Sequence, residues 1–137
     1  MKFRKKVVSR IKELRDENDI KQQELAELVD VSRQTIYYLE KGSYNPSLTL
    51  SLKIAEVFDK PIEEIFDFEP IIWDIIRKKT YEELEQISEI SGIDKNKIMR
   101  IPDINDEELD EVFTEEDLRK LSESVNKKFE NLFDIED

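Results

Sequence analysis

Two short apolar stripes, separated by a few residues, constrain the fold of this chain more than any other feature. The stripes consist of Leu25, Leu28, Val29, Ile36 and Leu39. Apolar residues that recur every three or four positions lie on one face of a helix, and Ala26 is small enough to let a second helix cross close by. Because the break between the stripes is so short, residues 22–42 predict two helices that cross at a steep angle.

The second of these helices has clear end signals and a polar outer face. Ser32 can cap its N-terminus, and Gly42 is typical of a helix C-cap. The side chains that point away from the buried stripe are those of Arg33, Gln34, Thr35, Tyr37 and Tyr38. Such side chains can hydrogen-bond the edges of bases or phosphate oxygens. The stretch therefore has the form of a DNA-reading helix-turn-helix.

The composition excludes several other classes of site. The chain has 137 residues with no cysteine and no histidine, which removes disulfides, Cys/His metal sites and thiol or imidazole catalysis. Its carboxylates fall on expected helix faces, with no Ser/Lys, metal or phosphate-loop arrangement around them. We therefore expect no enzymatic activity, no metal and no cofactor.

Membrane segments are also not expected. No apolar run approaches the roughly 20 residues that span a bilayer. The N-terminus is basic but lacks the apolar region of a signal peptide. We therefore expect a cytoplasmic protein without a membrane partner.

The net charge of −12 is unevenly divided along the chain. Residues 1–66 carry equal numbers of basic and acidic residues, so the whole acidic excess lies beyond them. Before residue 16, a single acidic residue, Glu13, accompanies a run of cations. These cations are Lys2, Arg4, Lys5, Lys6, Arg10, Lys12 and Arg15. Such a segment suits DNA phosphates, although a solvated helix face would have a similar composition.

Apolar periodicity predicts three further helices in the first half. One covers residues 7–17, one follows the cap residue Ser47 and runs to about Phe58, and a short one begins at Pro61. The residues expected to be buried by these helices are Val7, Val8, Ile11, Leu14, Leu48, Leu52, Ile54, Ala55, Val57, Phe58, Ile62, Ile65 and Phe66. Residues 1–66 thus predict a small all-α domain of five helices.

Six blocks within residues 7–66 match one family of DNA-binding domains in register. They are Ile-Lys-Glu-Leu-Arg (11–15), Gln-Glu-Leu-Ala-Glu-Leu (23–28), Val-Ser-Arg-Gln-Thr-Ile (31–36), Leu-Glu-Lys-Gly (39–42), Tyr-Asn-Pro-Ser-Leu (44–48) and Ile-Glu-Glu-Ile-Phe (62–66). On these blocks the chain resembles the phage repressor/Cro, or xenobiotic-response-element (XRE), family, especially its short bacterial and archaeal regulators. The resemblance implies a five-helix lambda-repressor-like fold.

The resemblance also implies roles for individual residues. Gln22 would grip a phosphate at the start of its helix, and the helix Ser32–Lys41 would enter the major groove. The groove-facing positions are Ser32, Arg33, Gln34, Thr35 and Tyr38. The positions that would meet the DNA backbone are Lys41, Ser43, Tyr44 and Asn45. Arg15 and Glu40 would form a structural ion pair. Asp30 departs from the family, which often has glycine there, but aspartate tolerates a left-handed backbone.

The pattern of the two central helices recurs 62 residues further along the chain. Ile87, Ile90, Ile93, Ile98 and Ile101 align without a gap with Leu25, Leu28, Val31, Ile36 and Leu39. The same offset predicts a first helix for this copy over residues 71–79, and Gly92 supplies a glycine for its turn. We therefore predict that a smaller helical region follows residues 1–66, with a second, degenerate helix-turn-helix within residues 67–102.

The charges of this second copy leave its role open. Its second helix would carry a basic face made of Lys95, Asn96, Lys97 and Arg100. The acidic residues around that face are Glu82, Glu83, Glu85, Glu89 and Asp94. DNA contact is one interpretation, and a packing module that orients or pairs the first domain is the other. The acidic surroundings favour packing.

The last segment, residues 103–137, is acidic and contains an amphipathic helix. After the capping signal at Thr114, apolar residues recur every three or four positions to about Phe133. They are Leu118, Leu121, Val125, Phe129 and Leu132. This stripe could pack on the second copy, pair two copies of the chain or bind another protein, and we favour dimerisation. The acidic end from Asp134 to Asp137 is expected to be solvated and frayed.

The sequence as a whole predicts a DNA-binding transcriptional regulator. We expect a repressor that binds double-stranded DNA as a homodimer, on an inverted repeat with half-sites about one helical turn apart. The alternative is an antitoxin-like or adaptor protein, in which residues 102–137 bind a protein partner and DNA binding serves autoregulation.

Overall fold

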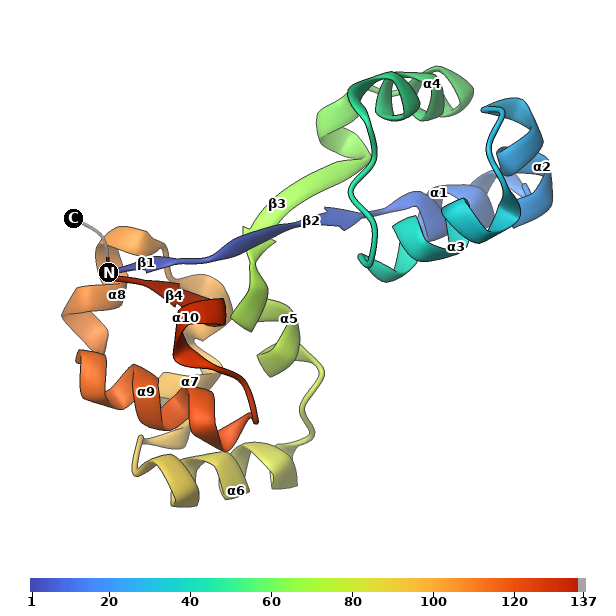
Figure 1. Cartoon of the computed structure of the whole chain (residues 1–137). Helices are drawn as coiled ribbons and strands as arrows, with labels where there is room; N and C mark the ends of the chain where they lie inside the picture. Colours follow the sequence, from blue (N-terminus) through green and yellow to red (C-terminus); the bar gives the residue numbers. More distant parts are fainter. Residues whose placement is uncertain (136–137) are drawn as a thin grey trace. The chain divides into compact units, whose positions relative to one another are not determined.

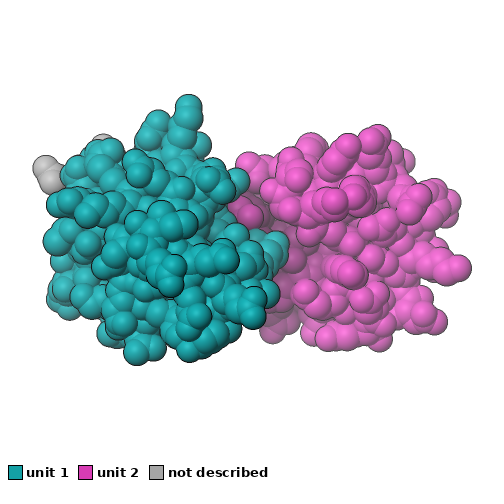
Figure 2. Space-filling model, turned by 90° about the horizontal axis from the view of Figure 1, so that it is seen from below, with its two compact units in different colours: residues 1–5, 70–137 teal, residues 6–69 magenta. Residues whose placement is uncertain are grey.

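The chain forms two compact units, which are described separately. The computed structural model describes residues 1–135, and Figures 1 and 2 show the course of the chain and the two units. Unit 2 consists of residues 6–69, and unit 1 combines residues 1–5 with the chain from Pro70 onward. The predicted boundary at residue 66 therefore falls a few residues early, and the first five residues belong to unit 1.

Unit 2 is a small helical bundle. Its elements are α1 (Ile11–Asn18), α2 (Gln22–Leu28), α3 (Arg33–Lys41), α4 (Leu48–Phe58) and the single 3-10 turn η1 (Ile62–Glu64). Its core consists of Ile11, Leu14, Leu25, Ala26, Val29, Ile36, Leu39, Leu50, Ile54, Phe58 and Ile65. Ser32 and Ser47 cap α3 and α4, with each hydroxyl accepting a backbone N–H three residues on. The all-α class and the central helix pair are as the sequence predicts.

The two ends of unit 2 differ from the prediction because they pair as strands. The expected helix over residues 7–17 begins only at Ile11, and the residues before it form β2 (Lys5–Ser9). The expected fifth helix is one 3-10 turn, after which β3 (Phe66–Pro70) pairs with β2. Pairing satisfies the backbone groups of both segments, and the β-branched residues of β2 favour an extended backbone.

Three leucines that the stripes assign to the core are exposed instead. Leu28 is 62% exposed, Leu48 72% and Leu52 51%. On α4 the buried face is formed by Leu50, Ile54 and Phe58. A helix that packs on one neighbouring layer buries only one stripe, so the leucines on its other side face outward.

Unit 1 is built from short helices and a two-stranded sheet. Its helical elements are α5 (Ile71–Arg77), α6 (Tyr81–Ser91), α7 (Lys95–Met99), η2 (Ile101–Asp103), α8 (Asp106–Val112), α9 (Glu115–Ser124) and α10 (Phe129–Leu132). Strand β1 (Lys2–Phe3) pairs antiparallel with β4 (Phe133–Asp134), so residues 2–3 and 133–134 lie side by side (Figure 1). The region after unit 2 is thus as substantial as unit 2, rather than the smaller extension that the sequence predicts.

The cations at the N-terminus are paired within unit 1. The terminal amino group lies 2.8 Å from a carboxylate oxygen of Asp110, and Arg4 Nε donates to the Glu130 carbonyl oxygen at 2.7 Å. The Lys5 ammonium lies 3.8 Å from Asp106. Arg4, which is also 3.8 Å from Asp134, and Lys5 therefore lie beside carboxylates of unit 1, although the sequence offered both cations to DNA phosphates.

The apolar stripe of the last segment is buried in the core of unit 1. The single helix predicted to end near Phe133 is broken, because Asn126 adopts a left-handed φ of 59° between α9 and α10. The stripe residues Leu118, Leu121, Val125, Phe129 and Leu132 all lie in the core. Asp134, expected to be frayed, pairs with Lys2 in the sheet, whereas Glu136 and Asp137 lie outside the described residues. The stripe is therefore not exposed for dimerisation in this fold.

The helix pairs α2–α3 and α6–α7 share a burial pattern at the offset of 62 residues. The matched buried residues are Leu25 and Ile87, Ile36 and Ile98, and Leu39 and Ile101. Leu28 and its counterpart Ile90 are both exposed. The turn residues Asp30 and Gly92 both have a left-handed backbone, with φ of 58° and 75°. The two pairs thus share core positions and turn conformation.

Candidate nucleic-acid interface

The helix α3 is fixed at both of its ends. Ser32 Oγ accepts a hydrogen bond from the backbone N–H of Thr35 at 3.1 Å. At the other end Gly42 adopts a φ of 74°, and its N–H donates to the Leu39 carbonyl oxygen at 3.1 Å. A left-handed C-cap of this kind favours glycine because a side chain would be strained there. The two caps define the length of α3 that can project into a groove.

A buried ion pair holds α3 against α1. Arg15 donates from Nε and Nη2 to the two carboxylate oxygens of Glu40, at 2.8 and 3.0 Å. The side chains of Arg15 and Glu40 are only 10% and 7% exposed, and the hydrogen bonds to Glu40 raise the pKa of Arg15 above its ordinary value. Arg15 also donates to the Ile20 carbonyl oxygen at 3.0 Å. This is the bidentate geometry that a buried guanidinium requires.

The same carboxylate fixes the start of α2. Gln22 Nε2 donates to Glu40 Oε1 at 3.2 Å, so Gln22, the first residue of α2, joins the Arg15–Glu40 pair. Glu40 therefore links α1, α2 and α3 through one side chain. In this position the Gln22 amide nitrogen braces the helices, and its amide oxygen is left for a donor.

The outer face of α3 is polar, aromatic and exposed. Arg33 and Gln34 are exposed, and Gln34 Nε2 donates to the Tyr38 hydroxyl at 3.2 Å. Tyr37 and Tyr38 pack edge to face with centroids 5.6 Å apart, and the Lys41 ammonium lies 4.7 Å from the Tyr37 ring centre. Thr35 is half-buried, and its hydroxyl hydrogen-bonds Ser32. The face thus presents one fork-shaped cation, one amide and two rings packed edge to face.

Two shallow hollows flank Arg33. One, of about 610 Å³, is lined by Arg15, Lys21, Gln22, Gln23 and Arg33. The other, of about 340 Å³, is lined by Arg33, Gln34 and Tyr37. The larger hollow brings the cations Lys21 and Arg33 together beside the first turn of α2. Cationic and amide donors in this arrangement suit a phosphate.

The loop after α3 extends this surface. Lys41, Ser43, Tyr44 and Asn45, the residues assigned to backbone contact, are all exposed. The structure therefore places every predicted DNA-facing residue in unit 2, with Gln22 and Thr35 half-buried and the others exposed.

Two further residues belong to this surface and were not among the predicted contacts. Lys21 lines the larger hollow, and Tyr37 is about as exposed as Tyr38. Lys21 could have been found from the sequence, because it is a cation directly before Gln22, the predicted phosphate-binding residue. The periodicity places Tyr37 on the outer side of the helix, but the family resemblance assigns it no groove contact.

Known proteins are similar to this part of the chain. The family model for the helix-turn-helix, HTH_3, covers residues 11–65. An HTH-type transcriptional regulator of Archaeoglobus fulgidus is 54% identical over 67 residues, which are 48% of this chain and 94% of the relative. The chain belongs to the helix-turn-helix family of DNA-binding transcriptional regulators.

Other helix-turn-helix regulators match over the same fraction of the chain. A regulator of Methanocaldococcus jannaschii is 46% identical over 61 residues, 44% of this chain and 92% of the relative. The regulator YgzD of Bacillus subtilis is 45% identical over 58 residues, 42% of this chain and 88% of the relative. The matches cover almost the whole of each relative, whereas more than half of this helix-turn-helix protein lies outside them.

Neither a metal-binding cluster nor a membrane-spanning helix is present among the residues that the structure describes. Within residues 1–135 no group of His, Cys, Asp and Glu side chains could hold a metal ion. The helices of that same range are all too short or too polar to cross a membrane.

Proposed function

We propose that this helix-turn-helix protein is a sequence-specific repressor that binds an inverted repeat as a homodimer. The observation that carries the proposal is the exposed face of α3, held from behind by the buried Arg15–Glu40 pair. A capped helix with a rigid base can enter the major groove with its outer side chains in fixed register. Occupation of the operator would then block transcription.

Arg33 and Gln34 are proposed to read the bases. Arg33 has a guanidinium fork that matches guanine O6 and N7, and the Gln34 amide can pair with adenine N6 and N7. Gln34 must exchange its bond to Tyr38 for one to the base, a change of partner within the same exposed face. Ser32, Thr35 and Tyr38 complete the reading face, and their contacts depend on the operator sequence.

The DNA backbone is proposed to be held at both ends of the helix pair. At one end are Lys21 and Gln22, and at the other Lys41 with the loop residues Ser43, Tyr44 and Asn45. Residues 6–69 contain 9 Lys or Arg against 14 Asp or Glu, so the unit has no general attraction for DNA. Binding must therefore depend on where the few cations lie, and it should weaken as salt is raised.

Paired substitutions in the full chain test the proposed reading face. Arg33→Ala and Gln34→Ala should each weaken binding to the preferred duplex about 5- to 150-fold, the loss expected for one bidentate base contact. Lys95→Ala and Asn96→Ala, at the matching positions of α7, serve as controls and should change little. Titrations by fluorescence anisotropy, with circular dichroism to verify folding, make the comparison. Equal affinities for all five proteins would overturn the proposal.

The pair α6–α7 is proposed to be a degenerate copy that serves packing rather than DNA binding. Lys95, which matches Arg33, has its ammonium 3.3 Å from Glu85 and 3.7 Å from the centre of the Tyr81 ring. Glu82, Glu89 and Asp94 are exposed nearby in sequence and would repel phosphates. Contacts of α6 with α9, and of α7 with η2, support a structural role.

A partner-binding role for residues 102–137 is the second candidate. The acidic outer surface of α8 and α9, and the matching of relatives to less than half of this chain, favour it. An antitoxin-like or adaptor protein would then use its DNA-binding unit for autoregulation. Purification of the full chain from its own cells should recover a stoichiometric partner, and loss of that partner on charge reversal at Glu111 and Glu115 would support this role. Recovery of the chain alone would count against it.

A further inference from the structure

The helix pair α6–α7 has an exposed side as well as the side that packs in unit 1. Ile87 and Ile98 are buried in the core, whereas Tyr81 and Met99 are 59% and 45% exposed on the other side. A hollow of about 670 Å³ lies between these two exposed side chains. The residues that line it include Tyr81, Glu85, Glu89, Asp94, Lys95 and Met99. The exposed side thus combines apolar surface with charge.

This hollow occupies the position that the hollows beside Arg33 occupy in unit 2. At the offset of 62 residues the lining residues match in pairs, which are Gln23 and Glu85, Arg33 and Lys95, and Tyr37 and Met99. The charge differs, because unit 1 has the carboxylates Glu85 and Asp94 where unit 2 has Gln23 and Ser32. A face that suits a phosphate in unit 2 therefore suits a cation in unit 1.

A cation of the chain itself already lies in this hollow. The Lys95 ammonium lies 3.7 Å from the centre of the Tyr81 ring and 3.3 Å from a carboxylate oxygen of Glu85, and it also hydrogen-bonds the Tyr81 hydroxyl. These contacts raise the pKa of Lys95 above its ordinary value, with the hydrogen bond to Tyr81 as the main cause. The Tyr81 ring and the Glu85 carboxylate thus form a binding position for a cation.

Two further carboxylates of the hollow have no cation beside them. Among the residues that the structure describes, neither Glu89 nor Asp94 forms an ion pair, and the Asp94 side chain does not cap α7. The hollow therefore holds three carboxylates against the single ammonium of Lys95. A ligand that places one cation on the Tyr81 ring and others on the free carboxylates would complement it.

We propose that this hollow binds an arginine-rich segment of a partner protein, and that Lys95 occupies the position of one arginine while the partner is absent. Arginine fits better than lysine, because its planar guanidinium can stack on the Tyr81 ring while it pairs with a carboxylate. A small amine would leave Met99 exposed, whereas a peptide segment would cover it. The inference goes beyond DNA reading, and it places the partner on α6–α7 rather than on residues 102–137.

Titration of the full chain with a defined peptide is the first test. The probe is a capped peptide of alternating arginine and alanine, and its counterpart has citrulline, which is neutral and of similar shape, in place of each arginine. In NMR spectra the arginine peptide should shift the amide signals of α6 and α7, and the citrulline peptide should not. Arginine amide alone should bind at least about tenfold more weakly. Binding of arginine amide as tight as that of the peptide, or shifts confined to other helices, would overturn the proposal.

Removal of the free carboxylates and removal of Lys95 should have opposite effects. Glu89→Gln combined with Asp94→Asn should weaken peptide binding about tenfold, since each exposed ion pair contributes up to about fivefold. Lys95→Ala should instead tighten binding about threefold, because a competing cation is lost from the Tyr81 ring. Lys97→Ala is the matched control, because Lys97 is an exposed lysine of α7 outside the lining of the hollow. Wild-type affinity in the double variant, or no tighter binding in Lys95→Ala than in Lys97→Ala, would contradict the proposal.

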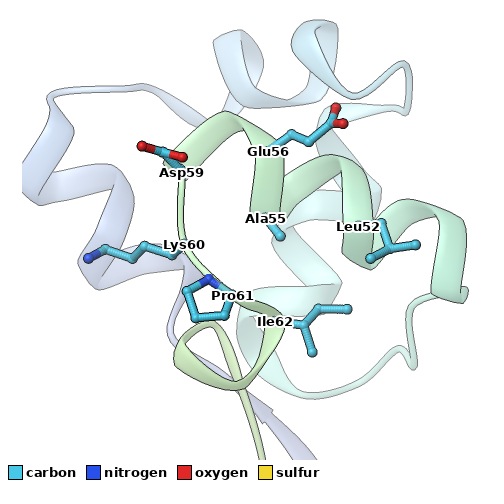
Figure 3. A pocket seen from close by; sticks show the side chains of 7 residues that line it. All are labelled: Leu52, Ala55, Glu56, Asp59, Lys60, Pro61 and Ile62. Carbon is cyan, nitrogen blue, oxygen red and sulfur yellow. The ribbon is translucent and has the colours of Figure 1, made fainter.

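A groove of unit 2 separates this site from a general attraction between charges. It lies between α4 and the start of η1 and has a volume of about 540 Å³ (Figure 3). Figure 3 shows its two carboxylates and one ammonium, on Glu56, Asp59 and Lys60, but the described residues that line it include no aromatic ring. Glu56→Gln combined with Asp59→Asn should therefore leave peptide binding within about twofold of wild type. A loss as large as that of the α6–α7 double variant, with circular dichroism unchanged in both, would overturn the site.

Discussion

The helix pairs α2–α3 and α6–α7 share their buried apolar positions but differ in how polar residues join them. In the first pair Gln22, Glu40 and Arg15 form one hydrogen-bonded group. The matching positions of the second pair hold Leu84, Pro102 and Arg77, so a buried leucine replaces the amide and a proline replaces the carboxylate. The first pair is thus clamped by a buried charge pair, whereas the second is joined by apolar packing and by the more exposed contact of Lys95 with Glu85.

The outer faces of the two pairs also differ, in whether their leading cation is free to meet DNA. Arg33 is exposed at the start of α3, whereas its counterpart Lys95 is held by Glu85 and Tyr81. A guanidinium that must meet a base has to remain exposed, and its helix has to be fixed from behind. The apolar pattern thus specifies the helix pair, and we propose that the polar residues around it determine whether the pair can read DNA.

Removal of the Arg15–Glu40 ion pair should produce the largest change in the free energy of unfolding. Glu40→Ala leaves the buried Arg15 without its partner and should lower the free energy of unfolding of unit 2 by about 3–5 kcal/mol. Because the pKa of Arg15 is raised, the guanidinium stays charged until the pH rises through that raised value, so the loss should be constant across the neutral range. Urea denaturation followed by circular dichroism measures it.

The two separate cores supply the control for this measurement. Trp73, the single tryptophan, packs against the core of unit 1, so its fluorescence reports the other unit. Its transition should stay in place in Glu40→Ala, as should both transitions in the exposed variant Glu27→Ala. A Glu40→Ala protein as stable as wild type would refute the stabilising role of the Arg15–Glu40 pair.

Substitutions at the turn residues should change the free energy of unfolding by less, and with opposite sign in the two helix pairs. Gly92→Ala forces a side chain into a left-handed backbone and should cost about 1–2 kcal/mol. Asp30→Gly relieves the same strain in the first pair and should stabilise unit 2 by up to about 1 kcal/mol. No atom lies within 4 Å of a Cβ added at Gly92, so the cost should come from the backbone alone. Changes of the same sign at both positions would contradict the shared turn geometry.

The salt dependence of binding should show the smallest difference between the pairs. Lys41→Ala should reduce the slope of log affinity against log salt by about 0.9, the contribution of one phosphate contact, without a change in preferred sequence. Lys97→Ala, an exposed lysine of α7, is the control and should leave the slope unchanged. Anisotropy titrations at several salt concentrations provide both values. Equal reductions for the two lysines would place α7 on the DNA.

Much of unit 2 could be predicted because its signals are local. The stripe from Leu25 to Leu39, the cap Ser32 and the turn at Gly42 each follow from a few neighbouring residues, and the structure has these elements as expected. The reading face follows from the same periodicity, since residues on the outer side of a buried stripe must be exposed. That reasoning includes Tyr37, which is exposed on the outer side of α3 as the periodicity predicts.

The parts that could not be predicted depend on contacts distant in sequence. Val7 and Val8 form a strand because β3 is available more than fifty residues later. Leu48 and Leu52 look like core residues in the sequence, and only the packing of α4 shows that Leu50 and Ile54 take the inner face. The N-terminal cations looked available to DNA until their partners in unit 1 were known.

Selection of bound duplexes from a random DNA pool tests the central claim most directly. The full chain, an Arg33→Ala variant and a Lys95→Ala variant would be selected in parallel. We expect an inverted repeat for the full chain, the same repeat for Lys95→Ala, and for Arg33→Ala a repeat with relaxed preference at one base pair of each half-site. A preference that survives in Arg33→Ala but changes in Lys95→Ala would contradict it, as would a folded chain that enriches no sequence.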